Sequence, residues 1–140
     1  MSTSLTADDL AFLRRPLHGF FTVAAGPLPP QPRPVWFEAT DDGTLQLFTG
    51  PETSKMRHLT HDPRASLVVA APVGERERWV SVAGRVEMVA ADAHDLVARL
   101  ARRYWDLDDA GRARDLEDLL AQDQVRLVIH PDSVSRYAME

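Results

Sequence analysis

Cysteine is absent from this chain of 140 residues, lysine occurs once, and no apolar run approaches the length of a membrane span. Without cysteine the chain has no disulfide and no thiolate metal site. A bilayer-spanning helix needs about 20 apolar residues, and the N-terminus lacks the basic and apolar regions of a signal peptide. We therefore expect one domain over residues 1–140, located in the cytoplasm and without a membrane partner.

Acidic side chains outnumber basic ones by 21 to 16, which gives a formal net charge of −5. This balance argues against a general nucleic-acid partner. Residues 106–123 hold seven acidic side chains and two arginines, so this segment alone accounts for the net charge. In the rest of the chain, positive and negative side chains are equal in number.

Several catalytic and metal-binding patterns are missing as well. The five histidines are scattered, and His58 and His61 are one residue short of the i, i+4 spacing of a helical metal site. No nucleophile-elbow, dinucleotide-binding or P-loop motif occurs. We expect no metal, and no side chain stands out as a general acid or base.

The segment 48–67 is the part of the sequence that indicates a ligand. Alternating side chains predict a strand over residues 45–49, which Gly50 and Pro51 end. Proline suits the first turn of a helix, and the predicted helix must stop before Pro63 because the residue preceding a proline avoids helical angles. The segment therefore reads as strand, turn, helix and a further strand.

Three hydroxyl groups and the single lysine lie around the start of this helix, at Thr49, Thr53, Ser54 and Lys55. The helix dipole and the free N–H groups of a first turn favour a phosphate or another anion. The alternative is an ordinary surface helix whose charged and polar side chains are solvated, namely Lys55, Arg57, His58 and His61.

This segment resembles that of the pyridoxamine 5'-phosphate oxidase-like, FMN-binding split-barrel family. The flanking segments RPVWFEATDDGTLQLFT and RWVSVAGRVEMV are similar to strands of the same family. Pyridoxamine phosphate oxidase itself has a C-terminal arg-leu-his-asp-arg segment that this chain lacks, so we do not expect that activity. The residues that carry the resemblance are Thr49, Thr53, Ser54, Lys55, Leu59, Asp62, Pro63, Arg64, Ser66 and Leu67.

The resemblance implies a mainly β fold with small helices (α+β), built as a six-stranded, mostly antiparallel split barrel. It also implies a homodimer with a flavin at the subunit interface, and an oxidoreductase that passes a hydride between FMN and an unknown small molecule. The implied cofactor contacts are Val35, Trp36, Phe37, Phe48, Thr49, Thr53, Ser54, Lys55, Arg57 and Trp79.

Three alternatives remain open for the function. One is a reductase of the same fold that uses the deazaflavin coenzyme F-420. The second is a flavin- or haem-binding carrier or sensor without turnover, and the third is a degenerate member that serves as an interaction module. FMN is favoured over the deazaflavin, because its compact phosphate monoester needs only one helix start and one lysine.

Hydrophobic periodicity and turn residues predict the other elements. Gly84, inside a strand, indicates close approach by another backbone or by a ligand. We expect the strand 18–25 to be buried on both faces, since its aromatic residues point both ways. The predicted elements are helices over 6–14, 92–105 and 106–121, and strands over 18–25, 33–40, 66–71, 78–89 and 124–130, with a further short strand in the tail.

Overall fold

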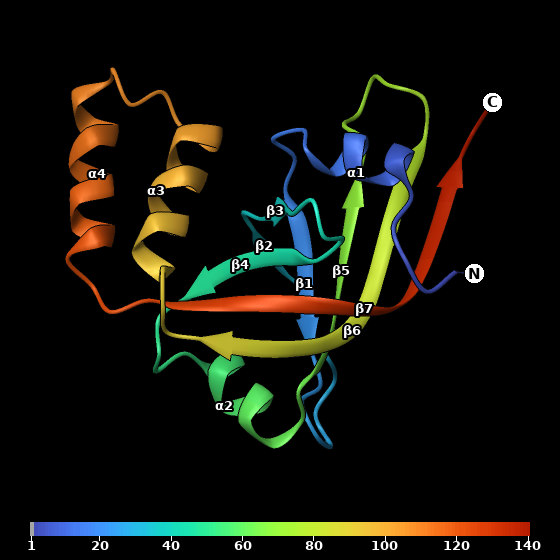
Figure 1. Cartoon of the computed structure of the whole chain (residues 1–140), viewed down its shortest axis with the longest axis horizontal. Helices are drawn as coiled ribbons and strands as arrows, with labels where there is room; N and C mark the ends of the chain where they lie inside the picture. The colour runs from blue at the N-terminus through green and yellow to red at the C-terminus, as the bar shows by residue number, and fades with distance from the viewer. Residues whose placement is uncertain (1) are drawn as a thin grey trace.

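The computed structural model describes residues 2–140, which form one seven-stranded sheet and four helices (Figure 1). Every strand pairing is antiparallel, in the order β2-β1-β5-β6-β7-β4-β3. No helix in this part of the chain is long and apolar enough to cross a membrane. The elements are α1 (Ala7–Leu13), β1 (Gly19–Val23), β2 (Arg33–Val35), β3 (Glu38–Ala39), β4 (Leu45–Thr49), α2 (Ser54–His61), β5 (Arg64–Ala70), β6 (Arg78–Val89), α3 (Ala93–Tyr104), α4 (Ala110–Leu120) and β7 (Val125–Ala138).

The predicted split-barrel architecture is confirmed, but the predicted count of six strands is wrong. The segment 33–40 was expected to be one strand and forms two, β2 and β3, which pair at opposite ends of the sheet. Trp36 and Phe37 carry the chain across the gap between those ends, so they have no strand neighbour on either side. Because the chain leaves one end of the sheet and joins the other at this crossing, the segment 33–40 forms two short strands instead of one continuous strand.

The long strands β6 and β7 hold the two halves of the sheet together, and Figure 1 shows both of them curving from one half into the other. Their register shifts between Ala83 and Gly84, which is a bulge that bends the pair. The predicted close approach at Gly84 is confirmed, because a Cβ there would lie 2.0 Å from the carbonyl oxygen of His130. The C-terminal strand was predicted too short, since β7 continues through Pro131 to Ala138.

Local signals set the helix boundaries. Thr6 caps α1 through a reciprocal pair, in which its hydroxyl accepts from the Asp9 N–H and the Asp9 carboxylate accepts from the Thr6 N–H. α3 buries Leu96, Val97 and Leu100 against the sheet, as its apolar stripe predicts. In contrast, α4 buries none of its residues, so its position depends on a small contact with α3 rather than on a core face.

One face of the sheet remains uncovered in the single chain. Phe20, Val68, Trp79 and Tyr137 lie there and are each between 37% and 44% exposed. We call these four residues the outer face. Strand register places Phe20 opposite Val68 and Trp79 opposite Tyr137, and the rings of Trp79 and Tyr137 stack with centroids 6.3 Å apart. The expectation that the first strand is buried on both faces is therefore wrong, because Phe20 is 43% exposed.

Candidate functional site

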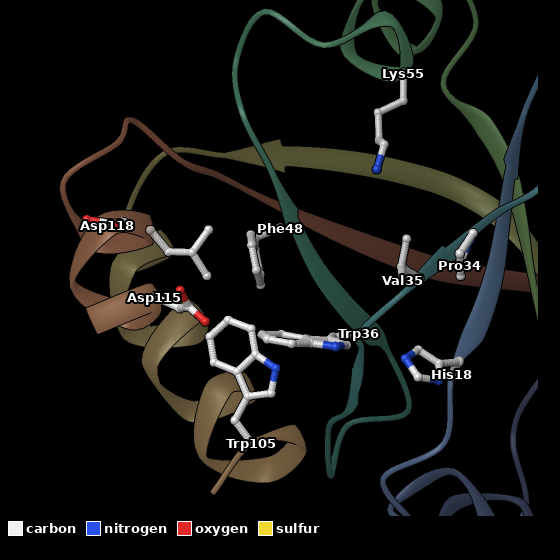
Figure 2. A pocket seen from close by; sticks show the side chains of 10 residues that line it. His18, Pro34, Val35, Trp36, Phe48, Lys55, Trp105, Asp115 and Asp118 are labelled. Carbon is white, nitrogen blue, oxygen red and sulfur yellow. The ribbon is translucent and has the colours of Figure 1, made fainter. Parts of the chain in front are cut away.

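An open cavity of about 580 Å³ lies between the split in the sheet and α4 (Figure 2). We call it the aromatic cavity. Its volume is in the usual range for a cofactor or small-molecule site, and its walls combine apolar rings with a few charged groups. The side chains that line it are His18, Pro34, Val35, Trp36, Phe48, Lys55, Trp105, Asp115, Asp118 and Leu119.

Trp36 is the centre of the aromatic wall. Its ring is stacked on Tyr104 with centroids 5.2 Å apart and planes 4° apart. Trp105 meets Trp36 edge-on at 4.7 Å, and Phe48 does so at 6.2 Å. Such stacked and edge-to-face pairs are favourable arrangements of aromatic rings. They hold the Trp36 ring in one orientation at the point where the chain crosses the split.

Tyr104 fixes this crossing through its hydroxyl group. The hydroxyl donates to the Leu17 carbonyl at 2.6 Å and accepts from the Phe37 N–H at 3.4 Å. Burial raises the pKa of the phenol, so it stays protonated and able to donate. The side chain of Phe37 is fully buried in the core. The N–H of Phe37, next to Trp36, thus forms its hydrogen bond with a side chain of α3 and not with a neighbouring strand.

Lys55 reaches the cavity from the opposite side to α4, as Figure 2 shows. Its ammonium group forms no hydrogen bond and no ion pair within residues 2–140. Burial lowers the pKa of its ammonium group, and the charge of Arg33 lowers it further. A positive charge that is partly removed from water and lacks an internal counter-ion is a favourable place for an anion.

The start of α2 has free backbone donors. Thr53 is the N-cap residue, but its side chain makes no capping hydrogen bond. Its hydroxyl instead lies 2.9 Å from the hydroxyl of Thr49 and donates to the Gly50 carbonyl at 3.2 Å. The first N–H groups of the helix therefore have no side-chain acceptor among residues 2–140, and the helix dipole adds to their attraction for an anion.

A second cavity of about 540 Å³ adjoins the first at Lys55 and Pro34, which line both. We call it the loop cavity, because the proline-rich segment 26–34 forms one of its walls. The segment covers this space without filling it. The polar groups that line the loop cavity are Gln31, Arg33, Ser54, Lys55 and His58, and its apolar lining includes Phe21, Val23, Leu28 and Pro29.

The structure brings together only part of the residues expected at the site. Val35, Trp36, Phe48 and Lys55 line the aromatic cavity, and Ser54 joins Lys55 in the loop cavity. The other expected residues line neither cavity. Thr49 and Thr53 bond to each other beneath the helix start, Phe37 lies in the core, Arg57 is exposed and donates to the Glu52 carbonyl, and Trp79 lies on the outer face.

Sequence reasoning missed the lining residues of α4 and those that lie just before β1 and just after α3. These are His18, Trp105, Asp115, Asp118 and Leu119. The available signal was the Tyr104-Trp105 pair, in which two large aromatic residues end a helix whose apolar stripe already has its core contacts. The acidic composition of residues 106–123 did not show that two of the carboxylates border a cavity.

Comparison with known proteins gives a consistent picture. A model of the pyridoxamine 5'-phosphate oxidase family matches residues 10–138. A solved structure described as an F-420 reductase is 26% identical, with a TM-score of 0.70 over 89% of this chain and 94% of that chain. Among curated proteins, no sequence matches this chain.

Two further structures are similar in fold alone, since their identity is below 25%. A FAD-binding protein from Mesorhizobium loti is 22% identical, with a TM-score of 0.65 over 98% of this chain and 97% of that chain. The haem storage protein HutZ from Vibrio cholerae is 13% identical, with a TM-score of 0.68 over 96% and 94%. From the family match and the shared fold, we conclude that this chain belongs to the pyridoxamine 5'-phosphate oxidase family of split barrels.

Proposed function

We propose that this protein binds a flavin-type cofactor in the aromatic cavity and passes a hydride between that cofactor and a small molecule. The observation that carries the proposal is Lys55, the single lysine, whose ammonium group lies at the junction of two cavities without an internal counter-ion. A cofactor with a planar ring and a phosphate matches this combination of an aromatic wall and a cation. The cofactor supplies the redox chemistry, and the protein supplies binding and orientation.

The ring of the cofactor would lie against Val35, Trp36 and Phe48. Trp36 is suited to this role because its contacts with Tyr104 and Trp105 hold it in place before a ligand arrives. A rigid aromatic wall reduces the entropy that binding must overcome. The phosphate would then lie near Lys55 and the free N–H groups of α2.

FMN is the first candidate for the cofactor, and direct titration of the apo protein tests it. We expect the purified protein to bind FMN with a shifted flavin absorption spectrum, and to bind riboflavin more weakly because riboflavin lacks the phosphate. Equal affinities for FMN and riboflavin would show that the phosphate is not recognised. A protein that binds neither flavin would rule out FMN as the cofactor.

The deazaflavin coenzyme F-420 is the second candidate, and two observations favour it. The loop cavity continues beyond Lys55 and contains Arg33, Gln31 and His58, which suits a longer anionic tail. The similar structure with 26% identity is also described as an F-420 reductase. Titration of the same apo protein with F-420 decides between the two, since an affinity well above that for FMN would reverse the order.

The outer face supports a homodimer. Phe20, Val68, Trp79 and Tyr137 are partly exposed apolar side chains on the four neighbouring strands β1, β5, β6 and β7, and exposed apolar patches mark interaction sites. A second copy of the chain would cover the patch through a two-fold, self-complementary contact. In such a dimer Trp79, which is outside both cavities of its own chain, would contact the cofactor only at the partner's site.

We expect sedimentation experiments to give a dimer at micromolar concentration. Dilution to monomer should release the cofactor, because the proposed site needs both chains. The variant Trp79→Asp should shift the equilibrium towards monomer by introducing a buried charge at the contact. Glu87→Asp is a conservative control on the same strand. A stable monomer that holds cofactor at full stoichiometry would contradict the shared site.

A further inference from the structure

We propose that the α4 end of the aromatic cavity binds a positively charged, planar substrate. The inference rests on the proposed function, since it concerns the molecule that would meet the cofactor in the same cavity. It follows from how charge is distributed along the cavity and from the rings that line it.

The two ends of the cavity carry opposite charge. Lys55 lies at one end, with Arg33 close enough for its charge to act on Lys55. Asp115 and Asp118 of α4 line the other end, and Figure 2 shows the Asp115 carboxylate beside the ring of Trp105. An anionic phosphate placed at Lys55 would neutralise the first end. Asp115 is already paired with Arg112, so the Asp118 carboxylate would remain without an ion-pair partner among residues 2–140 and would favour a ligand that carries positive charge.

The rings beside these carboxylates favour the same kind of ligand. Trp105 lies next to Asp115 and stands edge-on to Trp36, so aromatic surface and negative charge meet at one wall. The face of an indole ring attracts cations, and a carboxylate nearby adds to the attraction. A flat cation can satisfy both groups at once, whereas a neutral ring satisfies only the aromatic surface.

An internal cation already uses part of this wall. The guanidinium carbon of Arg112 lies 4.6 Å from the centroid of the Trp105 ring, and its Nη1 lies 3.3 Å from Oδ2 of Asp115. Trp105 and Asp115 therefore hold a planar cation in the structure itself. The carboxylate of Asp118 makes no ion pair or hydrogen bond with any of residues 2–140, so its charge is available to a ligand.

The geometry of α4 also provides a matched control. Asp115 and Asp118 are three residues apart and thus share one side of the helix, and both border the cavity. Glu117 carries the same charge on the same helix and is exposed like the two aspartates, but it does not line the cavity. A specific effect of the cavity carboxylates can therefore be separated from the general effect of an acidic helix.

The test uses the cofactor-loaded protein and three pyridine ligands of similar size, which are 1-methylnicotinamide (cation), nicotinamide (neutral) and nicotinate (anion). We expect calorimetry to show that the cation binds about three- to ten-fold more tightly than the neutral ligand, and that the anion binds most weakly. Replacing both aspartates, by Asp115→Asn and Asp118→Asn, should abolish the preference. The control variant Glu117→Gln should retain it.

Equal affinity for the cation and the neutral ligand would overturn the proposal. A preference that survives in the double variant, or one that Glu117→Gln removes, would overturn it as well. The ligand series on the unchanged protein needs no variant, and Asp118→Asn alone is a milder substitution if the double variant does not fold. The flavin spectrum of the same samples reports cofactor binding, so loss of the cofactor marks failure of the proposed function instead.

Discussion

Replacement of Lys55 by alanine is expected to weaken FMN binding about ten- to hundred-fold while the fold is retained. The change removes a charge-assisted hydrogen bond, which is worth about 1.5–3 kcal/mol, and each 1.4 kcal/mol corresponds to about a factor of ten in affinity. The fold should survive, because the ammonium group of the lysine makes no hydrogen bond or ion pair with residues 2–140 and the side chain is only partly buried. Equilibrium titration followed by flavin fluorescence measures the effect.

Two controls make this result specific. Riboflavin should bind Lys55→Ala and the unchanged protein with similar affinity, because it has no phosphate for the lysine to contact. Arg102→Ala removes one positive charge from an exposed position outside both cavities and should leave FMN affinity unaltered. If Lys55→Ala binds FMN as tightly as the unchanged protein does, Lys55 is not part of the phosphate site.

The variant Gly84→Ala is expected to lower the free energy of unfolding by about 1–3 kcal/mol or more, which is the usual cost of overpacking. An added Cβ would lie 2.0 Å from the carbonyl oxygen of His130, 2.8 Å from its carbon and 3.1 Å from the Cα of Pro131. All three are backbone atoms, so β6 and β7 would have to separate at the bulge. Chemical denaturation with an unchanged m-value would measure the loss of stability.

Gly111→Ala is the matched control, because it makes the same chemical change where space is available. The nearest atom to a Cβ there is Oδ1 of Asp109 at 3.6 Å, which is an ordinary contact. Since Gly111 lies inside α4 and alanine favours helix, stability should be unchanged or higher by up to about 1 kcal/mol. If Gly84→Ala unfolds at the same denaturant concentration as the unchanged protein, the bulge can adapt and close packing at this point is not required.

The parts of the fold that depend on neighbouring residues could be predicted from the sequence. Thr6 and Asp9 define the start of α1, and the alternating run 78–89 gives β6 with the bounds that the structure has. The same holds for α2, because Pro51 and Pro63 enclose it and leave Lys55 in its first turn. In each case the deciding interaction spans only a few positions along the chain.

The cavity walls could not be predicted in this way, because they depend on contacts between distant segments. Tyr104 binds the backbone of Phe37 across 67 positions of sequence, and such a contact leaves no periodic pattern. Thr49 and Thr53 look like ligand donors in sequence, yet their hydroxyls satisfy each other. Asp115 and Asp118 lie on a helix without buried residues, so no apolar stripe indicated which side faces the protein.

The two strands at the ends of the sheet have a consequence for how the protein associates with itself. β2 and β3 are three and two residues long, and Pro34 removes a backbone donor from the first of them. Short edges and prolines discourage a further strand from adding to a sheet. Stacking of hydrogen-bonded strands into open-ended fibrils is therefore disfavoured at both edges. The two-fold contact that we propose for the outer face would instead close after two copies and limit the assembly to a finite size.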